Sequence, residues 1–464
     1  MTRKTWVLVI ASVLVSSILL KGQAFAAGER KKIVMVSNSI AFVALQGKLL
    51  NPLDGTNLTD INVIHTLSLI YALAIELPPD KTVAEGLAYL QNLLLGISSV
   101  VVYDDLVVSV NPIIPALAQE IPSTETYDWG LQHIRVAVAH QEMPEWNGQG
   151  VEVAIVDTGV GNTVVGGCTH PDLPPYPQLI VKGFNALPGG GSYCDDHGHG
   201  THIAGIIAAK QNDLVIKGAA PQLSIVPVKV LNSNGKGHLS DLINGLQWVY
   251  NNPQIRLVNM SLGFSTDSSP LKAATKKLFD DHRTIMVASA GNKCSDDGDL
   301  GEDGGAEGDG PTCDTPQTTD IKYPAHYEWV LAVAATDIKD QITAYSPTAT
   351  GTGAKLDITA PGGVLPAPPN VPPPPNVAPI FSTCVYQTCP SGYGFGSGTS
   401  QAAAHVTGAL ALKLQQAPKI SLSAVQVLLQ QNAKDLGYPQ SRQGRGLIDA
   451  KCLLAPTSSQ CPPK

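Results

Sequence analysis

The stretch that decides the fold is VEVAIVDTG, residues 151–159, a run of apolar residues that ends in an aspartate, a threonine and a glycine. Near-continuous apolar strands are typical of parallel sheets, because both faces of such sheets are covered. Short apolar strands then alternate with helical stretches. We expect strands at 223–231, 256–260, 284–289 and 330–335, and helices at 201–209, 239–250 and 400–415. The alternation predicts an α/β fold, a doubly wound and mostly parallel sheet with helices on both faces.

The region before this sheet has a different texture. Residues 28 to about 117 contain none of the eight cysteines and mix strand-like and helical patterns. Lys31–Leu45 is expected to be strand-like, Val83–Leu95 has apolar residues at helical spacing, and 100–110 is a β-branched run. This mixture predicts a small α+β domain ahead of the main sheet.

Composition and charge argue against a nucleic-acid-binding protein. Of the 464 residues, 44 % are hydrophobic, 5 % are aromatic and 15 % are charged, and the net charge is −8. Phosphate contacts need Lys and Arg, and base stacking needs aromatic rings, so we expect no nucleic-acid partner.

The start of the chain predicts export. Arg3 and Lys4 precede the apolar run Trp6–Leu20, and Ala24-Phe25-Ala26 follows as a small-x-small cleavage site. This pattern predicts a secretory signal peptide over residues 1–26. The alternative, a membrane anchor, usually needs about 20 apolar residues. We expect a secreted monomer that is free of the membrane after cleavage, with an extracellular or a periplasmic destination left open.

Two segments have compositions unlike that of a buried hydrophobic core. Residues 294–313 hold five Asp and two Glu and no Lys or Arg, so this segment carries −7 of the net charge of −8. Residues 361–379 contain nine Pro and are expected to be extended and stiff. The sequence leaves the roles of both inserts open.

Three short motifs could supply the chemistry of one site. An aspartate ends the strand in IVDTG (155–159), a histidine begins HGTHIAG (199–205), and a serine follows a glycine turn in GTSQAAAH (398–405). A serine hydroxyl needs a base to take its proton, and imidazole can do this near neutral pH. A buried carboxylate then holds the imidazole in one tautomer and stabilises its cation. Side chains at the carboxyl ends of parallel strands can converge at one edge of the sheet.

In this order the motifs resemble those of the subtilisin-like serine protease family. The resemblance covers most of residues 118–450. Further segments that match the family are 259–263, 288–292, 323–325, 356–362 and 446–449. The resemblance implies that Asp157, His199 and Ser400 form a catalytic triad and that Asn292 donates to an oxyanion, with the Ser400 N–H as a second donor. The implied substrate-binding residues are Gly235, Lys236, Gly237, Ser261, Leu262, Gly263 and Phe264.

This chain departs from the family pattern at three positions. Gln401 stands where the family usually has Met, Ala404 where it has Pro, and Phe264 where it has Gly. Gln401 is expected to remove a site of methionine oxidation. Phe264 is expected to narrow the specificity pocket or to close part of the cleft.

The resemblance also implies a proenzyme. Residues 27–117 resemble the inhibitory propeptide of the family, which is removed by self-cleavage, and residues 118–464 would then be the peptidase domain. Because the segment after residue 117 looks like a mature family N-terminus, cleavage is expected near Leu117–Ala118.

A structural calcium ion is the one cofactor that the resemblance implies, and no organic cofactor is expected. Asp172 and Asn212 match family ligand positions, and Glu125 could replace Gln119 in the set. The implied ligands are Asp172, Asn212, Gln119, Lys210, Leu214 and Ile216. Lys210, Leu214 and Ile216 would bind the ion through their backbone carbonyl oxygens. Six oxygens are a reasonable number for calcium.

Two other functions remain open from the sequence. His197, His199 and His202 lie next to Asp195 and Asp196 and could hold a zinc ion for a metal-dependent hydrolase. Such a site would leave Ser400 and Asn292 without a role. Alternatively, the chain could be an inactive pseudoprotease whose cleft only binds peptides.

The eight cysteines allow 105 pairings, and proximity in the sequence alone suggests one of them. The pairs of nearest neighbours are Cys168–Cys194, Cys294–Cys313, Cys384–Cys389 and Cys452–Cys461.

Overall fold

The computed structural model describes residues 19–20, 30–50, 61–94, 97, 99–110, 113–115, 121–164, 167–173, 182–292, 321–350, 352–364 and 378–461. Almost all of the predicted signal peptide, the acidic insert 294–313, most of the proline-rich insert, Leu117–Ala118 and Gln119 lie outside these ranges. The chain divides into two compact units, residues 1–105 and 106–464. No helix within the described ranges is both long enough and apolar enough to span a bilayer.

The first unit is a small α+β domain, as the sequence predicts. Its five-stranded sheet has the order β1-β5-β2-β4-β3, and all pairs except β1–β5 are antiparallel. The elements are β1 (Leu19–Leu20), β2 (Lys31–Met35), α1 (Ser39–Leu50), β3 (Asn62–Leu67), a 3-10 turn (Ser68–Ile70), β4 (Ala72–Glu76), α2 (Val83–Leu93) and β5 (Val101–Asp104). Both helices bury apolar side chains in one cluster with the sheet, among them Leu45, Leu73 and Leu90.

The strand expected over Lys31–Leu45 is wrong beyond Met35. The strand ends there, and α1 begins at Ser39. The reason is local: the side chain of Asn38 accepts a hydrogen bond from the Ala41 N–H at 2.9 Å, which is the contact of a helix N-cap. The apolar residues that follow then bury one helical face.

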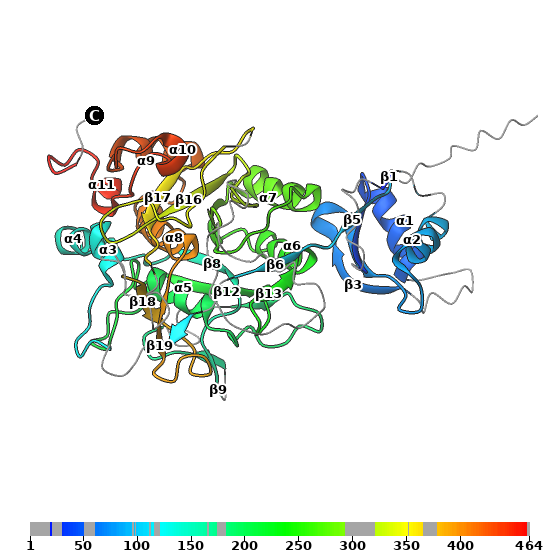
Figure 1. Cartoon of the computed structure of the whole chain (residues 1–464), viewed down its shortest axis with the longest axis horizontal. Helices are drawn as coiled ribbons and strands as arrows, with labels where there is room; N and C mark the ends of the chain where they lie inside the picture. The colour runs from blue at the N-terminus through cyan, green and yellow to red at the C-terminus, as the bar shows by residue number, and fades with distance from the viewer. Residues whose placement is uncertain are drawn as a thin grey trace, which may run out of the picture. The chain divides into compact units, whose positions relative to one another are not determined.

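The second unit is built on the parallel sheet that the sequence predicts (Figure 1). Its order is β11-β12-β8-β14-β15-β16-β17, and every neighbouring pair is parallel. The strands are β8 (Glu152–Asp157), β11 (Phe184–Asn185), β12 (Ser224–Lys229), β14 (Leu257–Met260), β15 (Ile285–Ser289), β16 (Val330–Thr336) and β17 (Ile358–Pro361). Every residue of β14 through β17 is buried, as a sheet covered on both faces requires.

Helices flank this sheet. The helix α8 packs against β14 to β17 and against α5, while α6 and α7 pack against each other. The helices are α3 (Trp129–His133), α4 (Val136–Glu142), α5 (His199–Ala208), α6 (Leu239–Tyr250), α7 (Ser269–His282), α8 (Thr399–Gln416), α9 (Leu422–Asn432), α10 (Gln440–Gln443) and α11 (Ala450–Leu454). The side chains of α8 are buried from Thr399 to Leu414, which explains its run of small and apolar residues.

Smaller sheets lie at the margins of the second unit. The strand β6 (Val107–Ser109) pairs antiparallel with β13 (Lys236–His238). The strand β7 (Ile114–Pro115) pairs antiparallel with β19 (Tyr393–Gly396), which pairs in turn with β18 (Ile380–Thr383). A further hairpin joins β9 (Asn162–Val164) to β10 (Gly167–Thr169).

Three of the expected disulfides are confirmed. Cys168–Cys194, Cys384–Cys389 and Cys452–Cys461 are bonded. The fourth expected pair, Cys294–Cys313, lies outside the described residues.

Candidate active site

Three of the predicted site residues follow neighbouring strands. Asp157 is the last residue of β8, Ser261 follows β14, and Asn292 comes shortly after β15. Because these strands are adjacent and parallel, their carboxyl ends meet at one edge of the sheet. This edge is where the sequence predicts the site.

Asp157 and His199 form a buried pair. The Asp157 Oδ1 and the His199 Nδ1 are 2.8 Å apart, and both side chains are fully buried. Asp157 Oδ1 also accepts the Thr158 N–H at 2.7 Å. Among the described residues, His199 Nε2 has no hydrogen-bond partner. The carboxylate therefore fixes the imidazole through one nitrogen and leaves the other for proton transfer.

Ser400 is the second residue of α8, and its hydroxyl lies beside the end of β14. The Ser400 Oγ donates to the Ser261 carbonyl oxygen at 3.0 Å, and the Ser261 Oγ donates to the Ser400 carbonyl oxygen at 2.9 Å. The described hydrogen bonds of Ser400 thus lead to Ser261, not to His199. Catalytic hydrogen bonds often form only when substrate is present.

Asn292 is held at the turn that leads into α8. Its Oδ1 accepts from the Thr399 N–H at 3.0 Å and from the Thr399 Oγ1 at 3.1 Å. A Cβ added to Gly398 would lie 3.1 Å from Asn292 Nδ2, so the amide nitrogen lies close to that turn. With its oxygen bound to Thr399, Asn292 has its amide nitrogen near the turn that precedes Ser400.

Asp195, which the sequence indicated only as a neighbour of a possible zinc site, supports the turn before His199 in the structure. Its buried carboxylate accepts hydrogen bonds from the N–H groups of His197, Gly198 and Thr201 and from the Thr158 hydroxyl. It therefore ties the turn before His199 to the strand end that carries Asp157. An aspartate just ahead of an expected helix is the sequence signal that could have indicated this N-terminal contact.

The predicted substrate-binding segments lie on both sides of the chain's own residues 107–110. Lys236 and Gly237 pair with Ser109 and Val108, and Ser109 also forms an antiparallel bridge with Gly263. The Gly235 carbonyl accepts the Val110 N–H at 3.1 Å. An extended peptide therefore fits here as a middle strand. The pairing of β7 with β19 was missed, because no sequence pattern indicates a two-residue strand.

Phe264 does not stand free in the cleft. It is only 5 % exposed and exchanges both backbone hydrogen bonds with Tyr323, at 3.1 and 2.9 Å. The peptide bond between Tyr323 and Pro324 is cis. Phe264 therefore contributes packing behind the Ser261–Gly263 segment.

The zinc alternative receives no support from the side-chain geometry. His199 faces Asp157, whereas His202 Nε2 lies 3.1 Å from the Ile380 carbonyl oxygen. Burial lowers the pKa of His202 to about 3. Within the described part of the chain, no three His, Cys, Asp or Glu residues are placed to bind one metal ion.

The expected calcium ligands lie around the loop 210–216. Asp172 is fully buried, and its Oδ2 accepts the Ile216 N–H at 3.1 Å, while its Oδ1 has no partner among the described residues. Glu125 Oε1 accepts the Asn212 and Asp213 N–H groups at 2.6 and 2.9 Å. A buried carboxylate oxygen without a partner beside a second carboxylate at the same loop fits a cation that prefers oxygen ligands.

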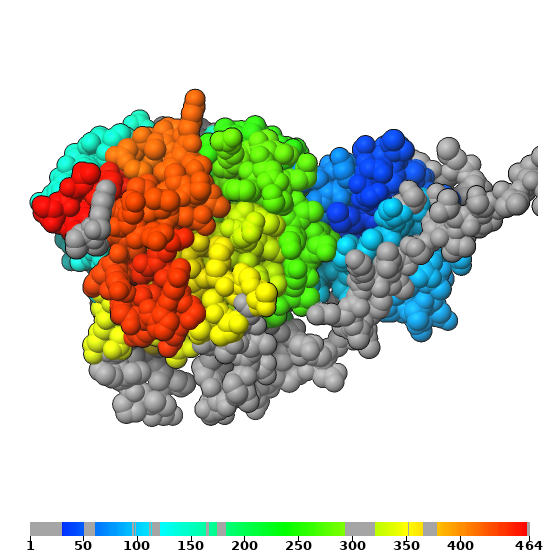
Figure 2. Space-filling model, turned by 90° about the horizontal axis from the view of Figure 1, so that it is seen from above, coloured from blue at the N-terminus to red at the C-terminus, as the bar shows by residue number. Residues whose placement is uncertain are grey.

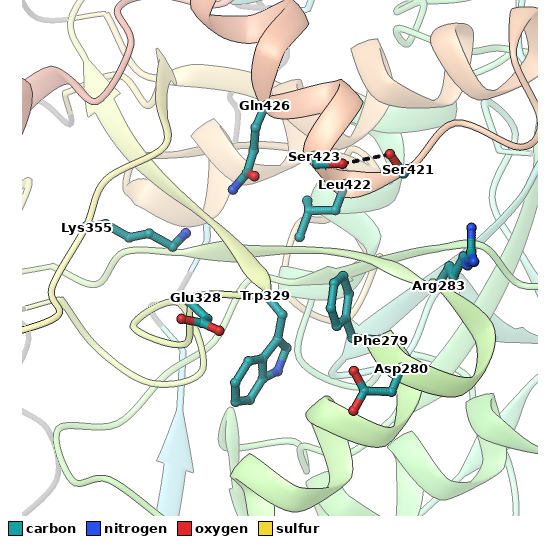
Figure 3. Close-up of a pocket in the computed structure, with 10 residues that line it drawn as sticks. All are labelled: Phe279, Asp280, Arg283, Glu328, Trp329, Lys355, Ser421, Leu422, Ser423 and Gln426. Carbon is teal, nitrogen blue, oxygen red and sulfur yellow. Dashed lines mark hydrogen bonds between the residues drawn. The ribbon is translucent and has the colours of Figure 1, made fainter.

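A separate pocket of about 600 Å³ includes none of the predicted catalytic residues (Figure 3). Its lining residues come from the C-terminal end of α7 and the residue after it, from the segments before β16 and β17, and from the start of α9. Its lining residues are Phe279, Asp280, Arg283, Glu328, Trp329, Lys355, Ser421, Leu422, Ser423 and Gln426. Figure 2 shows the green, yellow and orange parts of the chain that supply these residues side by side on one face.

A parallel sheet that carries a buried aspartate–histidine pair and a helix-start serine at its carboxyl edge is the architecture of an α/β serine hydrolase. The subtilase family profile matches residues 148–446. The chain is 34 % identical over 307 residues to subtilisin DY of Bacillus licheniformis, a match that covers 66 % of this chain and 91 % of that protein. It is 33 % identical over 334 residues to subtilisin Savinase of Lederbergia lenta, with coverage of 72 % and 98 %.

A third relative is longer. The chain is 33 % identical over 334 residues to the minor extracellular protease Epr of Bacillus subtilis, and the match covers 71 % of this chain but only 42 % of Epr. The chain belongs to the subtilase family, and its class is that of the subtilisin-like serine endopeptidases.

Proposed function

We propose that this chain is a secreted, self-processed serine endopeptidase that uses Asp157, His199 and Ser400 as a triad. The observation that carries the proposal is the buried 2.8 Å contact between Asp157 and His199, at the sheet edge to which Ser400 is bonded through Ser261.

The proposed reaction follows from this geometry. His199 Nε2 takes the proton of the Ser400 hydroxyl as its oxygen attacks the peptide carbonyl, and Asp157 stabilises the imidazolium that forms. The Asn292 amide and the Ser400 N–H donate to the developing oxyanion. His199 then gives the proton to the leaving amine, and water hydrolyses the acyl-enzyme by the same route.

The substrate is proposed to bind as an extended strand. Residues 107–110 already occupy that position between 235–237 and 261–263, so backbone pairing supplies the affinity and side-chain pockets supply the selectivity. The exposed Lys236 brings one positive charge to this edge.

The pairing of residues 107–110 with the two substrate-binding segments also supports a proenzyme. A segment that joins the N-terminal domain to the peptidase domain and fills the cleft would act as an inhibitor until it is cut. We propose that residues 27–117 are a propeptide ahead of a peptidase domain at 118–464. The mature N-terminus is proposed to form near Leu117–Ala118.

A calcium ion is proposed as the structural cofactor. Asp172 and Asn212 would bind it with Glu125 in place of Gln119, together with carbonyl oxygens of Lys210, Leu214 and Ile216. Bound there, the ion would neutralise two carboxylates and fix the loop after α5.

The protein is proposed to be exported and monomeric. The basic and apolar start of the chain supports a signal peptide over residues 1–26, and the name of the relative Epr includes the word extracellular. We propose that the mature enzyme acts outside the cytoplasm as a monomer on protein and peptide substrates.

A test of the function compares the purified chain with its Ser400→Ala variant on a mixed peptide library. The proposal expects internal peptide cleavage and removal of the N-terminal domain by the parent chain, and neither by the variant. A pseudoprotease would bind peptides and cleave none. Cleavage that survives Ser400→Ala would overturn the assigned nucleophile.

A further inference from the structure

We propose that the loop closed by the Cys384–Cys389 disulfide forms a substrate subsite on the leaving-group side of the scissile bond, where it takes an aliphatic side chain. The proposal rests on the proposed function of the cleft. It assigns to this disulfide the roles of a specificity determinant and a support for the turn before His199.

The first observation is an apolar contact. Ile113 is 4 % exposed and forms a buried cluster with Cys384 and Cys389, both of which are fully buried. The cluster lies within the second unit, because that unit begins at Leu106. The chain that fills the cleft therefore packs an isoleucine against the two cysteines of this disulfide.

The second observation is the position of this contact relative to the nucleophile. Before it, Val110 bonds to the Gly235 carbonyl; after it, Ile114 pairs with Phe395 of β19. Ser400 follows β19 by four residues in the chain. Its hydroxyl is bonded to Ser261, in the segment that contacts Ser109 through Gly263. From these contacts we place the proposed nucleophile between the two paired stretches. Val110 belongs to the acyl side of the cleft and Ile113 to the leaving-group side.

The third observation connects the disulfide to the catalytic base. The Thr388 hydroxyl donates to the His197 carbonyl oxygen at 2.5 Å. A Cβ added to Gly198 would lie 3.1 Å from Cys384 Sγ. The loop thus packs directly against the two residues that precede His199, so one short covalent ring contacts both the bound chain and the turn that positions the base.

The chemistry of the subsite follows from its walls. Two buried sulfur atoms offer a polarisable apolar surface and no strong hydrogen-bond partner. A branched aliphatic side chain would bury its surface there, whereas a carboxylate would lose hydration without compensation. We therefore expect the enzyme to prefer Ile, Leu or Val over Asp at one position within three residues after the cleaved bond.

The test is positional scanning with peptides that vary only on the leaving-group side. The parent enzyme should favour Ile over Asp at one position by about tenfold or more in kcat/KM. In the double variant Cys384→Ser/Cys389→Ser, that preference should fall to within about twofold, while preferences on the acyl side remain. The control is Cys452→Ser/Cys461→Ser, which removes a disulfide near the C-terminus and should keep the full preference.

Thr388→Val separates the two roles of the loop. It removes the hydroxyl that bonds to the His197 carbonyl and leaves the disulfide intact, so kcat should fall while the aliphatic preference persists. Labelling of Ser400 by a serine-hydrolase probe shows which variants retain a folded, reactive site. An unchanged preference in a Cys384→Ser/Cys389→Ser variant that still labels would overturn the subsite. Failure of the parent chain itself to label or cleave would instead overturn the proposed function.

Discussion

Single buried carboxylates set the geometry of the candidate site. Asp157 holds His199 directly, and Asp195 holds the turn before it by accepting from residues 197, 198 and 201. Both aspartates are fully buried and accept hydrogen bonds from backbone N–H groups and neighbouring side chains, although Asp157 Oδ2 has no partner among the described residues. His199, the proposed base, is thus held in one orientation, which is a condition for efficient proton transfer.

Asn292 supplies a prediction at this scale. In Asn292→Ala, kcat should fall by about 10²–10³, the range known for removing one oxyanion donor. KM should change little, because the lost interaction belongs to the transition state. Steady-state kinetics on one peptide measures both constants. The exposed Asn251 offers a matched control as Asn251→Ala, and a kcat for Asn292→Ala within about threefold of the parent would contradict the assigned role.

At the scale of elements, β6 resembles a bound substrate because it lies as a middle strand between two segments of the second unit. It is three residues long and pairs on one edge with β13 and on the other with Gly263. Two open strand edges separated by the width of one strand bind an extended chain through backbone groups, with little demand on its sequence.

A synthetic peptide of residues 106–115 should therefore inhibit the mature enzyme competitively. Proline at position 109 removes a backbone donor from the ladder, so Ser109→Pro should weaken inhibition roughly tenfold, whereas Ser109→Ala should not. Inhibition constants from competition with a peptide substrate give the comparison. Equal inhibition by the proline and alanine peptides would show that the strand pairing does not hold the peptide.

The loop after α5 gives a second prediction for an element. Removal of calcium by a chelator should lower the unfolding midpoint by several degrees, because a ligand bound only to the folded chain stabilises it. In Asp172→Asn the midpoint should be low and insensitive to calcium. Asp213→Asn, in the same loop but exposed, should respond as the parent does. Identical midpoints with and without calcium in the parent chain would remove the proposed site.

At the scale of the whole molecule, the sequence predicted the sheet better than its margins. The strands around VEVAIV were predictable because a covered parallel strand must be apolar throughout, and the motifs at their ends located Asp157 and His199. The start of α1 and the pairing of β7 could not be predicted this way. Asn38 decides the first through a single side-chain hydrogen bond, and a distant hairpin decides the second.

The hydrogen bonds of the Ser400 side chain also could not be predicted from the sequence. The motif predicts Ser400 as the nucleophile, yet the bond from its hydroxyl to the Ser261 carbonyl depends on how α8 packs against β14. Likewise, the pairing of Cys384 with Cys389 was expected from proximity, whereas its contact with Ile113 arises from tertiary packing alone.

Buried histidines predict how stability depends on pH. Burial lowers the pKa of His140 to about 4. Between pH 6.5 and about 4 the unfolded chain therefore binds a proton that the folded chain resists, so this group lowers stability as pH falls. His140→Gln should reduce the loss of stability between pH 6.5 and 4.5 by up to about 1.4 kcal/mol per pH unit. Unfolding midpoints measured across this range test it, and curves that run parallel for parent and variant would contradict it.

In the proposed mechanism, His199 and Asp157 activate the Ser400 hydroxyl. The most direct measurement is covalent labelling by a fluorophosphonate probe, followed by mass spectrometry of the labelled peptide. The account predicts one label on the peptide that contains Ser400, none in Ser400→Ala, and a rate reduced by orders of magnitude in His199→Ala. A folded enzyme that cleaves peptides without taking up the probe at Ser400, or that labels equally fast without His199, would contradict it.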